Sequence, residues 1–214
     1  MEILQFLGHL DQHLLQLSQQ YGAMAYVILF IIIFSETGLV VAPFLPGDTL
    51  LFVAGAVAAL DSSLAGAYNF PTLFAVLTAA AFLGNTVNFH IGRYLGPRVF
   101  HWEKSRWFNP RHLAQAHLFF ERHGGKTIIL SRFLPIIRTY APFVAGVGDM
   151  SRTRFLLFNA VGAVLWVGSL LMAGYFFGNV PFIKGNLTAV IVVIVVVTLL
   201  PVLFAGWRSR NHSR

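Results

Sequence analysis

The chain has 214 residues, of which 57% are hydrophobic and only 11% are charged, and it contains no cysteine. A soluble domain usually carries about 25% charged residues, so this composition excludes an ordinary soluble domain and indicates an all-α membrane protein. The lack of cysteine excludes disulfides and thiolate metal sites. The net charge of +7 would suit nucleic-acid binding in a soluble protein. In a membrane protein the expected partner is an anionic lipid surface, and no nucleic acid is expected.

Basic residues are absent from the first 92 positions and then become frequent. The first is Arg93, and seven of the fifteen Lys and Arg residues lie between Arg93 and Lys126. Because loops rich in Lys and Arg remain on the cytoplasmic side of a membrane, we expect the loop over 93–126 and the basic C-terminus to be cytoplasmic. The connection over 61–70, which has no basic residue, is expected on the opposite side.

The N-terminal part predicts an interfacial helix followed by a hairpin that is too short to span. Leucines and isoleucines recur at helical spacing over 2–18 with polar residues between them, a pattern typical of an amphipathic helix in the membrane interface. The next two apolar runs, over 23–34 and 49–60, are each shorter than the roughly 20 residues of a transmembrane helix. Because a polar, proline-bearing tip separates them, we expect a re-entrant hairpin.

The rest of the chain alternates full-length spans with a second broken segment. The segment over 127–148 is apolar but is interrupted by arginines and prolines. In chain order we expect a span over 71–95, a loop over 97–125 with a second interfacial helix, this broken segment, a span over 153–178, and a last span over 183–205 before the basic tail.

Two motifs recur in the two broken segments. Residues 44–55 read Phe-Leu-Pro, five residues, then Phe-Val-Ala-Gly, and residues 133–146 repeat both motifs with seven residues between them. An odd number of crossings separates the copies, so the hairpins would enter from opposite faces, as in transporters with inverted repeats. The predicted fold is an inverted repeat of amphipathic helix, re-entrant hairpin and transmembrane helix, followed by a C-terminal transmembrane helix. The boundaries are 1–96 for the first repeat, 97–180 for the second, and 181–214 for the last helix and tail.

Two acidic residues, Glu36 and Asp48, lie where the apolar arms of the first hairpin meet its tip. An ionisable side chain at mid-bilayer is unfavourable by about 2.5–3.5 kcal/mol on insertion scales, and it is a functional candidate for that reason. Since carboxyl groups take up and release protons, we predict a proton-coupling role for both. One alternative is that either residue lies at the membrane surface. For Asp48 a further alternative is capping of the helix that follows.

Two arginines, Arg132 and Arg138, mark the second hairpin, and both keep their charge at any physiological pH. A guanidinium group binds phosphate or carboxylate with paired hydrogen bonds, so one hypothesis is a phosphate-binding pair in a polar cavity. The alternative is a structural salt bridge to Glu36 or Asp48. Because Pro135 breaks the helix between the arginines, helical spacing does not decide whether they converge.

Three asparagines in the predicted spans are candidates for lining the cavity. Asn85 and Asn88 are three residues apart and share a helix face, and Asn159 holds the corresponding place in the second repeat. The alternative is that they join helices by hydrogen bonds, as polar side chains in membrane helices often do. Prolines and one glycine are expected to shape the hairpins: Pro43, Pro46, Gly47, Pro135 and Pro142.

No catalytic or metal-binding motif stands out in the sequence. The histidines lack spacings such as H-E-x-x-H, and there is no G-x-S-x-G motif and no phosphate-cradling glycine loop. We therefore expect no metal, no cofactor and no enzymatic activity.

Six short motifs, taken together, resemble one known family. In chain order they are Glu36 ahead of Pro43-Phe-Leu-Pro46-Gly47-Asp48, Gly84-Asn85, Gly92-Arg93-Tyr94-Leu95-Gly96, Phe119-Phe120-x-x-x-Gly124, Arg132-Phe133-x-Pro135-x-x-Arg138 and Phe143-x-Ala145-Gly146. This series resembles the DedA family of membrane proteins, which share the VTT domain, over about residues 20–180.

The resemblance implies two opposed re-entrant loops in a multi-pass protein of the bacterial inner membrane. It also implies movement of lipid, notably polyprenyl phosphate or phosphatidylethanolamine, with dependence on the proton motive force. The family's functional acidic pair corresponds to Glu36 and Asp48, and its essential arginines correspond to Arg132 and Arg138.

Residues and resemblance together predict a lipid flippase. Arg132 and Arg138 would bind the lipid phosphate, and protonation of Glu36 and Asp48 would free them to do so. One alternative is a proton-coupled exporter of small cations or drugs, which would depend more on the acids than on the arginines. Another is a non-transporting membrane scaffold, which Glu36→Gln would leave functional. A homo-oligomer is compatible with the sequence.

Overall fold

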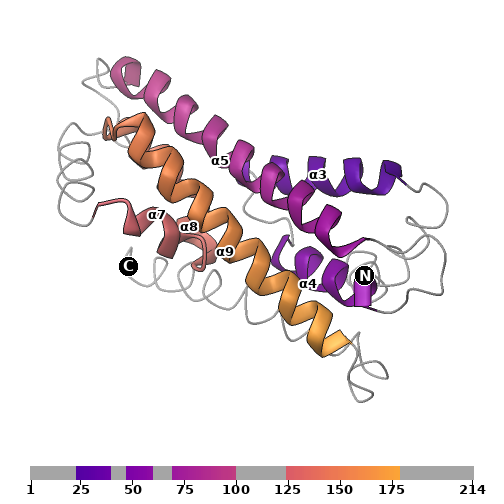
Figure 1. The fold of residues 1–214 in the computed structure, drawn as a ribbon. Coiled ribbons are helices and arrows are strands. Elements are labelled where there is room, and N and C mark those ends of the chain that lie inside the picture. Colours follow the sequence, from indigo (N-terminus) through magenta and orange to yellow (C-terminus); the bar gives the residue numbers. More distant parts are fainter. Residues whose placement is uncertain (1–22, 40–46, 60–68, 100–123, 179–214) are drawn as a thin grey trace, which may run out of the picture. The chain divides into compact units, whose positions relative to one another are not determined.

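The computed structural model describes residues 23–39, 47–59, 69–99 and 124–178. Within these residues the regular structure is helical, and no strand occurs, which confirms the predicted all-α class. The helices are α3 (Ala23–Gly38), α4 (Gly47–Ala59), α5 (Phe70–Val99), α7 (Lys126–Ser131), α8 (Pro135–Val147) and α9 (Arg152–Gly178) (Figure 1).

The chain divides into two compact units. Unit 1 comprises residues 1–32, 45–78 and 167–214, and unit 2 comprises residues 33–44 and 79–166. The boundaries fall within α3, α5 and α9, so each of these helices contributes one part to each unit.

The two long helices, α5 and α9, are each long and apolar enough to cross a membrane. Their apolar stretches are Phe70–Leu95 and Arg152–Phe177, with 26 residues each. At 1.5 Å per residue each stretch is about 39 Å long, which exceeds the roughly 30 Å hydrocarbon core of a bilayer. The predicted spans over 71–95 and 153–178 are therefore confirmed as long apolar helices.

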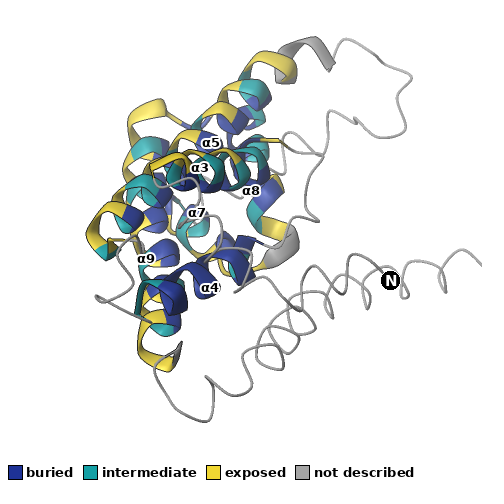
Figure 2. Cartoon of the chain, turned by 90° about the vertical axis from the view of Figure 1, so that its right-hand side faces the viewer, coloured by how far each residue is buried: buried dark blue, intermediate teal, exposed yellow. Residues whose placement is uncertain are grey.

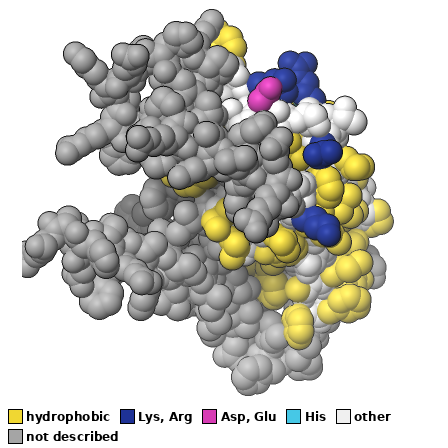
Figure 3. All heavy atoms as spheres, turned by 90° about the vertical axis from the view of Figure 1, so that its left-hand side faces the viewer, with side chains coloured by type: hydrophobic (Ala, Val, Ile, Leu, Met, Phe, Trp, Pro, Cys, Tyr) yellow, Lys and Arg dark blue, Asp and Glu magenta, His cyan; other side chains and the backbone are white. Residues whose placement is uncertain are grey.

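Large apolar side chains are exposed along both long helices, where Figure 2 shows many exposed residues. Figure 3 likewise shows hydrophobic side chains over most of the coloured surface of one face. Such a surface suits contact with lipid tails. The exposed side chains include Leu83, Val87, Leu157, Val161, Val164, Leu165 and Met172.

The start of α5 shows why the helix begins at this point of the chain. Asn69 Oδ1 accepts a hydrogen bond from the Thr72 amide at 3.2 Å, which is the contact of an N-cap residue. Pro71 lies in the first turn, where its missing N–H is tolerated. The Asn69 amide donates to the Tyr26 hydroxyl at 2.8 Å and so ties α5 to α3 within unit 1.

The two helices of the first broken segment are short. α3 has 16 residues and α4 has 13, which correspond to about 24 and 20 Å and fall below the thickness of the bilayer core. These lengths agree with the predicted half-length arms. The re-entrant course itself, and the repeat boundaries at 96 and 180, stay predictions.

The second broken segment has its break where Pro135 predicts it. α7 ends at Ser131 and α8 begins at Pro135. Leu134, immediately before the proline, is extended with φ −112° and ψ 107°, because the proline ring disfavours helical backbone at that position. Pro142, also predicted to shape this hairpin, lies inside α8, which continues to Val147.

In unit 1, α4 lies against α9 through two glycines. A Cβ on Gly55 would overlap with the Leu171 backbone, and a Cβ on Gly174 would overlap with the Phe52 carbonyl. Small residues allow this direct backbone contact between membrane helices. α4 is apolar nearly all round, and ten of its thirteen residues are buried, as expected for such a helix (Figure 2).

In unit 2, α8 lies against α5 in the same manner. A Cβ on Gly146 would overlap with the Phe89 carbonyl, and a Cβ on Gly92 would overlap with the Phe143 carbonyl. Beside this contact the rings of Phe89 and Phe155 stack with 4.1 Å between their centroids. The core of the unit comprises Phe89, Ile128, Ala145, Met150 and Phe155.

The turn after α8 carries an ion pair near the surface. Asp149 has a φ of 56°, a backbone conformation that Asp tolerates better than most residues. Its Oδ1 lies 2.8 Å from Arg93 Nη2, and the two side chains are 73% and 33% exposed.

Several predicted elements lie outside the described residues. They are the interfacial helix over 2–18, most of the loop over 97–125 with its interfacial helix, the last span over 183–205, the basic tail, and Pro43 and Pro46 at the first hairpin tip.

Candidate functional site

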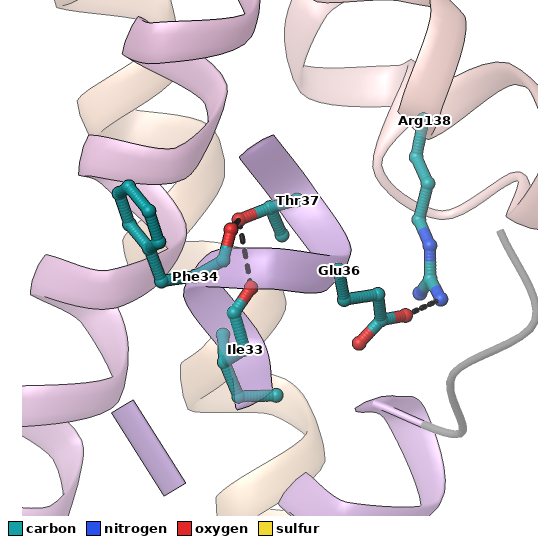
Figure 4. A network of polar contacts seen from close by, with 5 residues as sticks. All are labelled: Ile33, Phe34, Glu36, Thr37 and Arg138. Carbon is teal, nitrogen blue, oxygen red and sulfur yellow. Dashed lines mark hydrogen bonds and ion pairs between the residues drawn. The ribbon is translucent and has the colours of Figure 1, made fainter. Parts of the chain in front are cut away.

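Glu36 lies in the last turn of α3 and is buried, with only 1% of its surface exposed. Its Oε1 accepts a hydrogen bond from Arg138 Nη2, although 102 positions separate the two residues. Figure 4 shows the carboxylate and the guanidinium group pointing toward each other. Burial of a carboxylate is strongly unfavourable unless it is paired, so this ion pair explains how the end of α3 accommodates the charge.

Arg132 is also buried, 2% exposed, but its surroundings differ from those of Arg138. Its Nη2 donates to the Ala81 carbonyl at 3.1 Å and to Asn159 Oδ1 at 2.6 Å. Asn85 supplies another acceptor at 3.0 Å when its amide oxygen faces Arg132. Arg132 Nε has no hydrogen-bond partner among the described residues. Within that part of the chain, this buried cation therefore bonds to neutral groups alone.

One face of α9 forms the slot that Arg132 occupies. Asn159, Gly162 and Trp166 are three and four residues apart, so they lie on the same helix face. A Cβ on Gly162 would come within 3.0 Å of Arg132 Cδ and 3.2 Å of Nε, so the glycine leaves room for the side chain. The guanidinium carbon of Arg132 then lies 5.9 Å from the centre of the Trp166 ring.

Asn88 joins the two backbones that carry the ion pair. Its Nδ2 donates to the Thr37 carbonyl at 3.3 Å and to the Thr139 carbonyl at 2.9 Å. Thr37 follows Glu36 directly, and Thr139 follows Arg138 directly. The amide thus holds α3 and α8 at the spacing that the ion pair requires.

Asn159 is held in turn by α5. Its Nδ2 donates to the Phe82 carbonyl at 3.0 Å and to Thr86 Oγ1 at 3.1 Å, which turns its Oδ1 toward Arg132. The asparagines therefore join helices by hydrogen bonds, as one alternative expected. In addition, Asn85 lines the cavity beside Arg132, whereas Asn88 and Asn159 bond to residues of its wall.

These groups enclose a small cavity within unit 2. Its volume is about 10 Å³, which is room for a single water molecule. Two arginines and one glutamate carry the formal charges of the lining, so the wall has one excess positive charge. The lining residues are Glu36, Thr37, Asn85, Arg132, Arg138, Thr139 and Trp166.

The chemistry of this cavity is that of an ion site. Guanidinium groups donate hydrogen bonds to an anion, and the carboxylate can exchange a proton. Among the described residues, no group of three or more His, Asp or Glu could hold a metal ion.

The structure brings together four of the predicted site residues, Glu36, Asn85, Arg132 and Arg138. Asp48 belongs to unit 1, where it lies in the first turn of α4, a favourable place for a carboxylate near a helix N-terminus. Capping of this helix by Asp48 and its proton-coupling role both stay predictions.

Sequence reasoning missed Trp166 and Gly162. A signal for the tryptophan was available, because tryptophans in membrane proteins gather at the two interfaces and Trp166 lies near the middle of a predicted span. Gly162 offered no comparable signal, since glycines are frequent in membrane helices for packing reasons alone.

Comparisons with known proteins are consistent with these features. The sequence model of the VTT domain matches residues 45–176. Protein DedA of Escherichia coli (strain K12) is 49% identical over 199 residues, which cover 93% of this chain and 90% of that protein. An uncharacterized membrane protein of Mycobacterium leprae (strain TN) is 44% identical over 185 residues, covering 86% and 81%. Inner membrane protein YqjA of Escherichia coli (strain K12) is 35% identical over 201 residues, covering 89% and 88%. No solved structure matches the chain.

Proposed function

Because this chain belongs to the DedA family of VTT-domain membrane proteins, we propose that it moves a phosphate-bearing lipid across the membrane and couples this movement to protons. The observation that supports the proposal most is the buried cavity with two guanidinium groups and one carboxylate. Its excess positive charge favours an anion, and arginine pairs suit phosphate oxygens.

In the resting state the Glu36 carboxylate occupies the position near Arg138 that the negatively charged phosphate of the substrate would take. The carboxylate pairs with Arg138, and the cavity is too small for a phosphate group. Arg132 is already desolvated and meets neutral acceptors, so it remains ready for an anion. A lipid phosphate can enter only when the wall opens and the ion pair separates.

In the loaded state Glu36 carries a proton. Protonation removes its charge, frees Arg138, and leaves both guanidinium groups to share the phosphate oxygens. The acyl or prenyl tail remains in the bilayer while the head group crosses. Proton entry supplies about 2.3 kcal/mol per charge for each 100 mV of membrane potential. Asp48 is the second proton-coupling residue of this scheme.

The architecture that fits this cycle is the predicted inverted repeat with two re-entrant hairpins. The reciprocal glycine contacts of the two Phe-Val-Ala-Gly helices support it, because the same helix pairing occurs once in each unit. The basic segment over 93–126 and the C-terminus face the cytoplasm in this arrangement, and the protein lies in the bacterial inner membrane.

The charge of the cavity also bears on the rival functions. Two arginines in a lining with one carboxylate repel a cation, so an exporter of cationic drugs has less support. A non-transporting scaffold would not require Arg132 to be buried with neutral hydrogen-bond acceptors alone, as it is among the described residues. We expect no enzymatic step, because lipid translocation makes and breaks no covalent bond.

Reconstitution into proteoliposomes tests the proposal. Labelled polyprenyl phosphate and labelled phosphatidylethanolamine are placed in one leaflet, and their appearance in the other is followed with and without a proton gradient. We expect wild-type protein to move at least one of them, and Arg132→Ala, Arg138→Ala and Glu36→Gln to reduce movement at least tenfold. Arg152→Ala, an exposed residue of α9, is the matched control and should retain activity.

Two results would overturn the proposal. One is intact, folded wild-type protein that moves neither lipid under any gradient. The other is lipid movement that survives loss of both arginines, which would show that the cavity does not bind the lipid phosphate.

A further inference from the structure

A tryptophan in the middle of α9 contacts both arginines of the cavity. Trp166 is 2% exposed and lines the cavity with them. The guanidinium carbon of Arg138 lies 5.3 Å from the ring centroid, and that of Arg132 lies 5.9 Å from it. Both distances fall within the roughly 6 Å reach of a cation–π interaction.

Two cations that face one small cavity repel each other. The single carboxylate of the lining offsets one of the two charges, and Arg132 meets neutral acceptors. When Glu36 loses its charge, this offset is lost, and the two cations repel each other without compensation in a medium of low dielectric constant. The arginines stand on either side of the break at Pro135, so the helical backbone alone does not keep them together. The negative face of an aromatic ring attracts both.

We propose that Trp166 is a positioning residue of the anion site, whose indole ring keeps the Arg132 and Arg138 guanidinium groups at one place so that both bind a single phosphate group. The inference rests on the proposed function for the lipid, but the geometry applies equally to free phosphate. Among aromatic side chains, tryptophan binds cations best, which suits a ring with two cationic neighbours.

Simple filling of the core is the competing explanation of Trp166. It predicts that any large apolar side chain would serve as well. The rest of the same helix face argues against it, because Gly162 makes room for the Arg132 side chain and Asn159 accepts a hydrogen bond from its guanidinium group. This face of α9 is therefore shaped for an arginine at two positions besides Trp166.

The tryptophan also provides a spectroscopic test. The chain has four tryptophans, so replacing Trp102, Trp107 and Trp207 by Phe leaves Trp166 as the sole one. In the full-length, detergent-solubilised protein we expect inorganic phosphate or geranyl phosphate to change the Trp166 emission, because an anion shifts both cations relative to the ring. Arg138→Lys in this background should reduce the response, and the exposed control Arg152→Ala should not. A sole-tryptophan protein that binds phosphate without any change in emission would contradict the proposal.

Affinity measurements on single variants separate positioning from core filling. Trp166→Phe keeps an aromatic face, and we expect its affinity for inorganic phosphate and geranyl phosphate to stay within about threefold of wild type. Trp166→Leu keeps apolar bulk without that face, and we expect an affinity about tenfold lower. Thermal unfolding of both variants in detergent shows whether they fold. Equal affinities for folded Phe and Leu variants would overturn the positioning role.

The two proposals can fail separately. A Trp166 response to phosphate, without any lipid movement in proteoliposomes, would support the positioning role and overturn the lipid function. Wild-type lipid movement and wild-type affinity in Trp166→Leu would overturn the positioning role and leave the lipid function standing. A response to geranyl phosphate alone would assign the site to a lipid head group, and a response to inorganic phosphate alone would assign it to the free anion, with the positioning role supported in both cases.

Discussion

In unit 1, α4 meets α9 through Gly55 and Gly174, and in unit 2, α8 meets α5 through Gly146 and Gly92. The Phe-Val-Ala-Gly motif that makes the contact is identical in both, yet the polar groups are distributed unequally. Among the described residues, all the buried polar and charged side chains except Thr49 belong to unit 2. Within the described residues the same kind of glycine contact between helices, here called the packing frame, thus occurs in both units, but the buried charged site occurs only in unit 2. A packing frame can therefore recur in a protein without the site that it supports.

The starts of the two helices show where the units diverge. Asp48 lies four residues before Phe52 in α4, and Arg138 lies five residues before Phe143 in α8. Each motif helix therefore begins with a charge, but of opposite sign. In unit 2 that charge meets the buried Glu36. Substitutions at the cavity and at the glycine contacts can test whether frame and site are separable.

The largest effect is expected from removing the cation that pairs with Glu36. Arg138→Ala should lower the free energy of unfolding by about 3–5 kcal/mol at neutral pH, because a buried carboxylate loses its ion-pair partner. Unfolding in detergent, followed by circular dichroism, measures this loss. The double variant Glu36→Gln/Arg138→Ala should recover part of it, since neither charge then remains. A loss no larger than that of Arg93→Ala, whose ion pair is more exposed, would contradict the expectation.

A somewhat smaller effect is expected at Asn159, which accepts a hydrogen bond from Arg132 in the wall of the cavity. Asn159→Leu removes an acceptor from the buried Arg132 guanidinium group and should lower the free energy of unfolding by about 1.5–3 kcal/mol. Asn159→Asp places a carboxylate beside the same guanidinium group and offsets the excess charge of the site. We expect Asn159→Asp to weaken phosphate binding more than Asn159→Leu does, as measured by titration with inorganic phosphate. The opposite order would show that the charge of the cavity does not govern anion binding.

The glycine contacts test the comparison directly. Gly55→Ala and Gly146→Ala should each lower the free energy of unfolding by about 1–3 kcal/mol, because a new methyl group would overlap with the backbone of the facing helix. Only Gly146→Ala should also reduce phosphate affinity, since α8 carries Arg138. The control is Gly168→Ala, whose added methyl would meet Phe74 at an ordinary 3.4 Å. Equal losses of affinity in both glycine variants would mean that the frame and the site are not separable.

The smallest effect is expected at the exposed ion pair of unit 2. Asp149→Asn keeps a residue that tolerates a positive φ and removes a charge that is largely in water. The free energy of unfolding should change by less than about 1 kcal/mol, and lipid movement should be unchanged. A large loss of either quantity would show that this turn contributes to function.

Much of the helical framework could be predicted from the sequence because its causes are local. Apolar runs of more than twenty residues indicate α5 and α9, and Pro135 dictates the break between α7 and α8 through its own ring. Glu36, Arg132 and Arg138 were identifiable as site candidates because charge is costly inside an apolar segment. Pro142 shows the limit of such rules, since α8 continues through it.

The sequence by itself thus determined the class of the protein, its two long apolar helices and the charged residues that require an explanation. These features depend on overall composition, on the length of apolar runs and on the local effect of proline, and all of them can be read along the chain. Only the tertiary structure decided that Arg138 and not Arg132 pairs with Glu36, that Arg132 meets neutral amides and a carbonyl, and that Trp166 contacts both arginines. These contacts join residues up to 102 positions apart, across a break that removes helical periodicity as a guide. Their partners are set by which helix faces pack together, and no local pattern of residues encodes that choice.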